Sequence, residues 1–207
     1  GFRARGLRGA EVDRRCRQAY HNIIDLTLPV VSLISGRRIT KSIMQQTGDW
    51  DIEDYWLPFF CVSTSLTTAR PMIHRRGNSA LAIRSSVSIP GVLPPVPWAG
   101  ELLVDGGVLN NLPVDVMREI NPFGVVIAVD VAAPAGPATQ LDYGTELSGW
   151  RVLAGKLVTG DESGSAPGIA ATMMQSMVVG SALKRQQILE QGLADLRGLG
   201  PIQRART

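Results

Sequence analysis

The chain has few residues of the types that usually carry metal or redox chemistry. Its 207 residues include two cysteines and two histidines. Cys16 and Cys61 lie far apart in the sequence, so they form neither a disulfide framework nor a pair at metal-ligand spacing. We therefore expect two buried free thiols in a reducing compartment, and no metal site.

Long apolar runs are also missing. The start of the chain is rich in arginine and has no apolar segment of the kind that a secretory signal contains. The longest weakly polar stretch, residues 169–183, is shorter than the roughly 20 residues of a membrane-spanning helix and contains Gln175. The sequence therefore predicts no helix that spans a membrane.

Patterns for nucleotide or nucleic-acid binding are absent as well. No glycine-rich nucleotide motif follows a predicted strand, and there is no helix-turn-helix, zinc or aromatic-platform pattern. The net charge is only +3, and much of the basic excess lies at the two ends. Basic ends can contact anionic lipid or nucleic acid, but we favour a solvated helix face with loose tails. Nucleic acid is not expected as a partner.

What is present is the composition of a globular protein, with 44% hydrophobic and 19% charged residues, in a length that can bury one sizeable core. Apolar and β-branched runs predict strands at residues 57–66, 102–105 and 125–131, with a strand end at 72–75. Helical spacing with start and stop signals predicts helices at residues 10–26, 40–46, 80–88, 113–120 and 169–191. This order predicts an α/β fold with a layered, mostly parallel central sheet flanked by helices.

The most informative segment is residues 101–115, ELLVDGGVLNNLPVD. A short buried strand ends on Asp105, and Gly106 and Gly107 follow, which lets the backbone turn sharply and leaves no side chain beside the carboxylate. Asn110 and Asn111 are expected to hold the turn before the next helix. Taken alone, Asp105 has two interpretations: a carboxylate that caps a turn through nearby N–H groups, or a catalytic base.

A second segment, SSVSIPGVLPPV at residues 85–96, precedes the first at a fixed distance. Together the two segments strongly resemble the patatin-like phospholipase family. Residues 25–29, DLTLP, and 56–60, WLPFF, are most similar to the neuropathy target esterase branch and its bacterial relatives. The resemblance runs from about residue 5 to about residue 190.

The resemblance implies a lipid acyl hydrolase with a catalytic dyad of serine and aspartate, acting on phospholipid or lysophospholipid esters. The aspartate of the family's Asp-Gly-Gly motif corresponds to Asp105, within Asp105, Gly106 and Gly107, with Asn110 and Asn111 in support. A serine hydroxyl is a poor nucleophile until a positioned base takes its proton. Such a dyad needs no cofactor. A cytoplasmic protein, or one peripheral to the inner face of a membrane, is expected.

The sequence departs from the family at the nucleophile. No Gly-x-Ser-x-Gly motif occurs in the 207 residues, and the glycine-rich oxyanion loop is missing too. Ser79, Ser165 and Ser181 lie in segments that match the motif only in part, and none is expected to be the nucleophile. His21 and His74 are expected to be ordinary surface or capping residues.

We therefore expect the chain to start just after the nucleophile elbow, to lack the family's N-terminal strand, and to be inactive by itself. The alternative is a non-catalytic lipid-binding or regulatory module of the same fold. Residues 1–135 are expected to form the C-terminal part of the hydrolase domain, 136–195 a helical extension packed on it, and 196–207 a disordered tail.

Overall fold

The computed structural model describes residues 6–19, 23–130, 169–192 and 194–199. The α-helices are α1 (Gly9–Ala19), α2 (Arg37–Thr47), α3 (Ser79–Ser86), α4 (Val114–Ile120) and α6 (Ile169–Glu190). Two short 3-10 helices are η1 (Ile52–Asp54) and η2 (Gly106–Val108). The strands are β1 (Cys61–Ser65), β2 (Arg70–His74), β3 (Val96–Trp98), β4 (Glu101–Asp105), β5 (Ile127–Asp130) and β6 (Leu196–Leu199).

The larger sheet has the strand order β2-β1-β4-β3, and all three of its strand pairs are antiparallel. The mostly parallel central sheet predicted from the sequence is therefore not confirmed, although helices and strands in layers agree with an α/β protein. The reason is local. Ala99 and Gly100, with φ of 51° and 82°, join β3 to β4 in a two-residue turn with both φ values positive, the turn type that closes an antiparallel hairpin. Parallel pairing joins β5 and β6.

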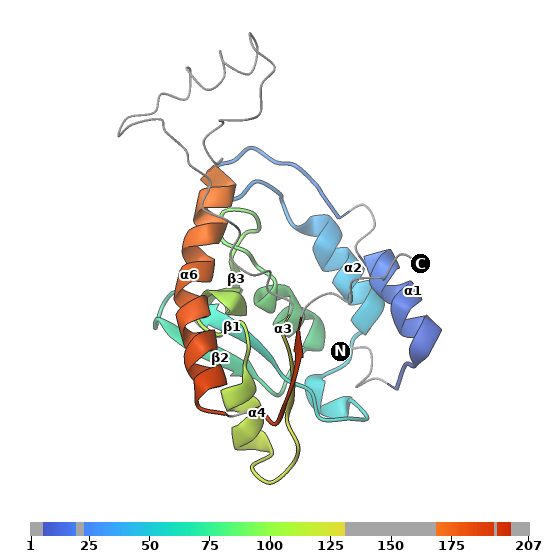
Figure 1. Cartoon of the computed structure of the whole chain (residues 1–207). Coiled ribbons are helices and arrows are strands. Elements are labelled where there is room, and N and C mark those ends of the chain that lie inside the picture. The colour runs from blue at the N-terminus through green and yellow to red at the C-terminus, as the bar shows by residue number, and fades with distance from the viewer. Residues whose placement is uncertain (1–5, 20–22, 131–168, 193, 200–207) are drawn as a thin grey trace, which may run out of the picture.

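The larger sheet coils strongly. His74 at the end of β2 stacks on Trp98 at the end of β3, with ring centroids 4.7 Å apart, although β2 and β3 are opposite edges of the sheet. Such coiling follows from the right-handed twist of strands. Helix α3 packs against β1 and β4, while α6 packs against η2, so that the sheet lies between α3 and α6 (Figure 1).

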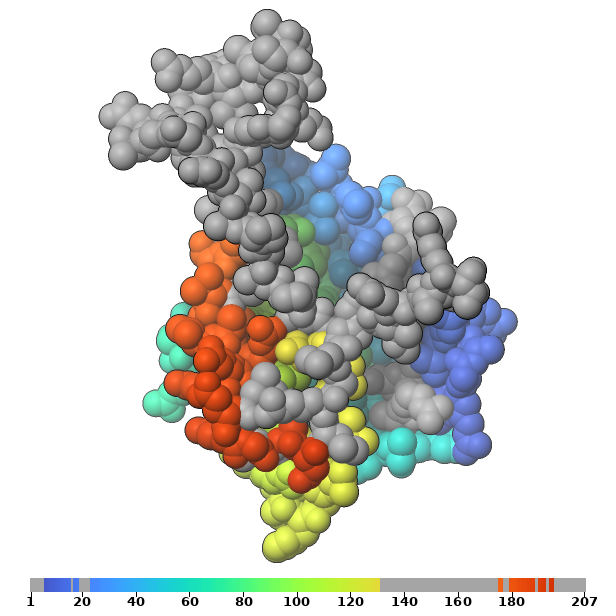
Figure 2. Space-filling model, viewed as in Figure 1, coloured from blue at the N-terminus to red at the C-terminus, as the bar shows by residue number. Residues whose placement is uncertain are grey.

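A cluster of buried apolar side chains joins the C-terminal elements. It consists of Val114 from α4, Val126 and Ala128 in and beside β5, and Ile188 from α6, all at most 5% exposed. In Figure 2 the orange and red surface of α6 adjoins the yellow-green surface around α4. Residues 196–199 were expected in a disordered tail. They instead form β6, because pairing with β5 satisfies their backbone groups.

Most other predicted elements are present, with shifted ends. The described part of the first helix is Gly9–Ala19, and residues 23–26, predicted to belong to it, are not helical. Helix α2 begins at Arg37, before the predicted start at residue 40, and the Thr40 hydroxyl donates to the Gly36 carbonyl oxygen within its first turn; Gly48 follows its last residue. Strand β3 was not predicted. Residues 136–168 of the predicted helical extension lie outside the described residues.

In the described parts of the chain, no helix combines the length and the apolar character that a bilayer crossing requires.

Candidate active site at the end of strand β4

Asp105 is the last residue of β4 and the residue on which η2 begins. Its backbone N–H donates to the Ser88 carbonyl oxygen at 2.9 Å, which ties the end of the strand to the end of α3. Its side chain accepts a hydrogen bond at Oδ1 from the Gly107 N–H, at 2.7 Å. The first bond fixes the backbone of Asp105, and the second fixes the orientation of its carboxylate.

Space requires glycine at position 106, and at position 107 a side chain would crowd the Asp105 carboxylate. A Cβ on Gly106 would lie 2.1 Å from the Val62 carbonyl oxygen, because η2 lies directly against β1. A Cβ on Gly107 would lie 3.0 Å from Asp105 Oδ1. The sequence led us to expect glycine for a sharp turn of the backbone, but neither residue has the positive φ that only glycine adopts readily. Close approach of backbone and carboxylate is the physical reason.

Burial dominates the electrostatics of Asp105. It raises the pKa of the carboxyl above its ordinary value, while the hydrogen bond from the Gly107 N–H opposes that rise. Within the residues that the structure describes, Oδ2 has no hydrogen-bond partner. A half-desolvated carboxylate with one oxygen fixed and the other available has the properties of a general base.

Asn110 and Asn111 occupy different environments. Asn110 is 3% exposed, and its backbone N–H donates to the Gly106 carbonyl oxygen at 2.8 Å. Its amide donates to both carboxylate oxygens of Asp115, at 2.9 and 3.2 Å, and Asp115 also pairs with Lys184 of α6 at 2.9 Å. Burial by itself would raise the pKa of Asp115, but the hydrogen bonds from Asn110, Lys184 and Val116 together lower it. Asn111 is exposed. Hydrogen bonds thus link Asn110 to the Asp105 turn, while Asn111 lies beside Gly107 of that turn, where a Cβ on Gly107 would be 3.7 Å from the Asn111 Cβ.

A comparison with protein-family models matches residues 14–118 of this chain to the model described as "Patatin-like phospholipase". That range is about half of the chain and includes Asp105 and both glycines. The chain belongs to the patatin-like phospholipase family. The resemblance predicted from the sequence is confirmed.

Curated relatives agree with the family assignment. "Neuropathy target esterase sws" from Drosophila melanogaster is 39% identical over 145 residues, which are 69% of this chain and 10% of the relative. "Lysophospholipase NTE1" from Scheffersomyces stipitis is 39% identical over 146 residues, 70% of this chain and 9% of the relative. "Patatin-like phospholipase domain-containing protein 7" from Mus musculus is 41% identical over 133 residues, which are 63% of this chain and 10% of the relative. The chain spans about a tenth of the length of the curated relatives that it matches.

One polar pair beside the patatin-like Asp-Gly-Gly turn was missed from the sequence. Ser63 Oγ lies 2.7 Å from His74 Nε2, and both residues are at most 5% exposed. Ser63 stands opposite Asp105 in the β1–β4 pair, so the two share one face of the sheet. The prediction that His74 is a surface or capping residue is wrong. The alternation of Cys61, Ser63 and Ser65 in β1 was the available signal.

Ser63 is a poor candidate for the nucleophile. It is completely buried, and its hydroxyl already bonds the imidazole, so an ester could reach it only if the sheet opened. Burial lowers the pKa of His74, whose ring stacks on Trp98. We interpret the Ser63–His74 bond as the contact that satisfies two polar groups inside the coiled sheet.

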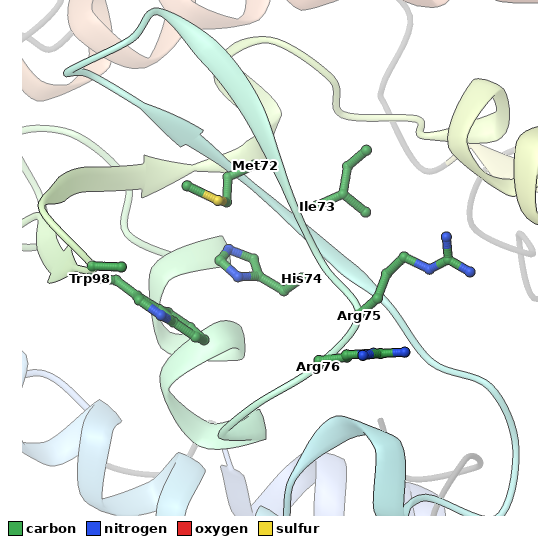
Figure 3. Close-up of a pocket in the computed structure, with 7 residues that line it drawn as sticks. Met72, Ile73, His74, Arg75, Arg76 and Trp98 are labelled. Carbon is green, nitrogen blue, oxygen red and sulfur yellow. The ribbon is translucent and has the colours of Figure 1, made fainter.

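A cavity of about 590 Å³ opens next to this pair, along β2 and the β3–β4 turn. Figure 3 shows Met72, His74 and Trp98 on one side of β2, and Ile73 and Arg75 on the other. Asp105 does not line it. In the described part of the chain no three metal-ligating side chains come together, and Cys61 is a free thiol whose pKa burial raises to about 12. The side chain of Cys16 lies outside the described residues.

Proposed function

We propose that this chain carries the base of a serine lipid acyl hydrolase, Asp105, and that the serine nucleophile belongs to sequence outside these 207 residues. The observation that supports the proposal is the Asp105 carboxylate: it ends a strand, burial raises its pKa, and one of its oxygens is available. Membership of the patatin-like family supports the reaction class. The lack of a Gly-x-Ser-x-Gly motif in these residues supports a dyad whose aspartate lies in this chain and whose serine lies outside it.

In the proposed reaction, Asp105 takes the proton of the serine hydroxyl as the oxygen bonds to the ester carbonyl carbon. The carbonyl becomes an oxyanion, the ester C–O bond breaks, and the leaving alcohol takes the proton back from Asp105. Water then repeats the sequence on the acyl-serine and releases the fatty acid. A pKa raised by burial brings the carboxylate closer to the working pH, where a base is most effective.

The proposed substrates are carboxylic esters of phospholipids or lysophospholipids. The names of the relatives, an esterase and a lysophospholipase, support this class. The reaction as proposed uses no cofactor. Because such substrates reside in membranes, we propose a cytoplasmic protein that contacts the inner face of a membrane peripherally.

The first test uses the 207-residue chain itself. With a short-chain p-nitrophenyl ester, it should release no more p-nitrophenol than a buffer blank. Turnover that an organophosphate blocks would contradict the proposal, because it would require a nucleophilic serine among these residues.

The second test uses the natural reading frame extended upstream of the codon for Gly1 until a Gly-x-Ser-x-Gly motif is included. In that protein Asp105→Asn should lower kcat for lysophospholipid hydrolysis by about 10²–10⁴-fold. Glu119→Gln, an exposed carboxylate on α4, is the matched control and should leave kcat unchanged. An upstream frame without such a serine, combined with lipid binding and no hydrolysis, would favour a lipid-binding module instead.

A further inference from the structure

Six large apolar side chains are exposed within ten residues between α1 and α2. We call residues 24–33 the apolar hairpin. Its exposed members are Ile24 (63%), Leu26 (82%), Leu28 (78%), Val30 (81%), Val31 (69%) and Leu33 (40%). Isolated exposed apolar residues are common on protein surfaces, but a contiguous group of this kind marks an interaction site.

The hairpin is held in place by its backbone. An antiparallel bridge joins Leu26 to Ile34, and the Thr27 N–H donates to the Leu33 carbonyl oxygen at 3.2 Å. Its returning arm is fixed to the proline-rich loop, residues 87–95 between α3 and β3. The N–H groups of Leu33 and Ile34 donate to the carbonyl oxygens of residues 91 and 92 in that loop, at 2.9 and 3.0 Å. The fold therefore presents these side chains to solvent on a supported element. In Figure 1 the hairpin runs along the upper edge of the molecule from the start of α2.

Asp25 closes the base of the hairpin. Its carboxylate accepts hydrogen bonds from the Ser35 hydroxyl at 2.5 Å and from the N–H groups of Gly36 and Arg38 at 3.1 and 3.2 Å. Burial by itself would raise the pKa of Asp25, but these bonds outweigh it and lower the pKa. The single carboxylate of residues 24–41 is thus bonded inward to the start of α2.

The surface around the base is cationic. Arg37 and Lys41 lie one turn apart at the start of α2, where the first turn has no acidic residue. Both are exposed, and in the described residues no carboxylate forms an ion pair with either. Arg38 donates from its guanidinium to the Ile24 carbonyl oxygen at 3.0 Å, which joins α2 to the outgoing arm.

The same base borders a shallow, open cavity of about 730 Å³ between α2, α3 and the proline-rich loop. Its lining includes the aliphatic groups of Met44, Leu81, Pro95 and Val96, with Arg37 and Lys41 beside them. A volume in this range suits a small ligand, and an apolar lining beside cations suits a chain with an anionic or phosphate-bearing head. Apolar side chains, cations and an apolar cavity therefore meet at one place.

We propose that the apolar hairpin docks on an anionic lipid bilayer, with its side chains among the acyl chains and with Arg37 and Lys41 at the head groups. Apolar groups flanked by lysine and arginine are the pattern of interfacial membrane-binding segments. The cavity then faces the lipid surface and offers room for an acyl chain drawn from it. This binding rests on the proposed function and deepens it by assigning the peripheral membrane contact to the apolar hairpin, and it involves no residue of the Asp105 turn.

The experiment is co-flotation of the 207-residue chain with vesicles of phosphatidylcholine, with or without phosphatidylserine. The chain should bind the mixed vesicles more tightly, and salt should weaken that binding. The double variant Leu28→Ser and Val30→Ser should bind both kinds of vesicle at least about tenfold more weakly. The double variant Arg37→Gln and Lys41→Gln should lose the preference for phosphatidylserine.

Two control variants match these changes. Phe123→Ser removes an apolar side chain that is 99% exposed elsewhere, and the double variant Arg70→Gln and Arg75→Gln removes two exposed cations of β2 and its end. Both should bind vesicles like the unchanged chain, and so should Asp105→Asn, which separates docking from catalysis. The hairpin side chains are exposed, so their replacement should leave the unfolding temperature unchanged, which circular dichroism would verify.

Equal vesicle binding by the unchanged chain and by the Leu28→Ser and Val30→Ser variant would overturn the proposal. So would an absence of vesicle binding by the unchanged chain. If light scattering instead finds an oligomer that this variant dissolves, with no vesicle binding, the hairpin is a protein interface and the proposal is wrong.

Discussion

Asp105 has its properties because of two contacts on opposite sides. Its backbone N–H is bonded to Ser88, and its Oδ1 is bonded to the Gly107 N–H. The first contact fixes where β4 ends, and the second fixes how the carboxylate is turned. At the residue scale the site is therefore a strand end, a close-packed turn and one desolvated charge.

Gly106→Ala should destabilise the fold. The added Cβ would lie 2.1 Å from the Val62 carbonyl oxygen, and backbone cannot move aside as a flexible side chain can. We expect the free energy of unfolding, measured by urea titration, to fall by about 3 kcal/mol. Gly180→Ala in α6 is the matched control, because its Cβ would meet nothing within 4 Å, and it should raise stability by roughly 0.5–1 kcal/mol. A smaller loss for Gly106 than the gain for Gly180 would contradict the close approach of η2 to β1.

Asp105 should also make stability depend on pH. Burial raises its folded pKa above the unfolded value, so its contribution is fully present below the unfolded pKa and is lost as pH rises through the folded pKa. Asp105→Asn removes that dependence. From about pH 3 to about pH 7, the variant should gain stability relative to the unchanged chain by about 1.4 kcal/mol for each unit of pKa rise. Urea unfolding at several pH values measures this difference. An opposite trend would mean that the folded protein stabilises the ionised carboxylate.

At the scale of elements, the turn is tied to two helices. Asn110 connects η2 to Asp115 at the start of α4, and Lys184 connects that carboxylate to α6. The Gly-Gly turn is thereby linked to a helix nearly 80 residues further along the chain. Pairing of β5 with β6, and the cluster around Val126 and Ile188, complete the same layer.

Asn110→Ala should lower the free energy of unfolding, because it breaks the link between η2 and α4. It removes two hydrogen bonds from a side chain that is 3% exposed and leaves the buried part of Asp115 with fewer donors. We expect a loss of about 2 kcal/mol in the free energy of unfolding. Asn111→Ala, at an exposed neighbouring position, should change stability by less than about 0.5 kcal/mol. Equal effects of the two substitutions would remove the distinction that the structure draws between them.

Whole-molecule behaviour depends on how much apolar surface the described fold leaves uncovered. In and just before strand β5, Val126 and Ala128 are buried. The side chains that alternate with them, Val125, Ile127 and Val129, are 64–68% exposed. Parallel strands in α/β proteins are normally covered on both faces. This alternation therefore indicates a sheet face that is available to another surface, separate from the apolar hairpin.

The 207-residue chain should associate through this face. Replacing Ile127 and Val129 by threonine keeps residues that favour strands and removes apolar surface, so self-association measured by light scattering should fall. Leu102→Thr is the control, because the Leu102 side chain is 41% exposed on β4, outside this face, and its replacement should leave association unchanged. A chain that is monomeric at all concentrations would show that the exposed face does not bind a second copy.

Prediction from the sequence succeeded where the signal is local. The strand before Asp105, the glycines after it and the helix at α4 follow from neighbouring residues, and all three are present. The mostly parallel pairing that was predicted is not confirmed for the larger sheet, because the two-residue turn at Ala99 and Gly100 was not recognised as a hairpin. The bond between Ser63 and His74 was missed because it joins two strands whose register only the folded sheet defines.

The sequence by itself determined the family, the Asp-Gly-Gly turn and the absence of a Gly-x-Ser-x-Gly motif in these residues, because each depends on the order and spacing of neighbouring residues. Tertiary structure decided that the larger sheet is antiparallel, that Asn110 is buried and hydrogen-bonded to Asp115 while Asn111 is exposed, and that the apolar hairpin is held outward. It also decided the raised pKa of Asp105, because burial is a property of what packs around a side chain and not of its neighbours in the chain.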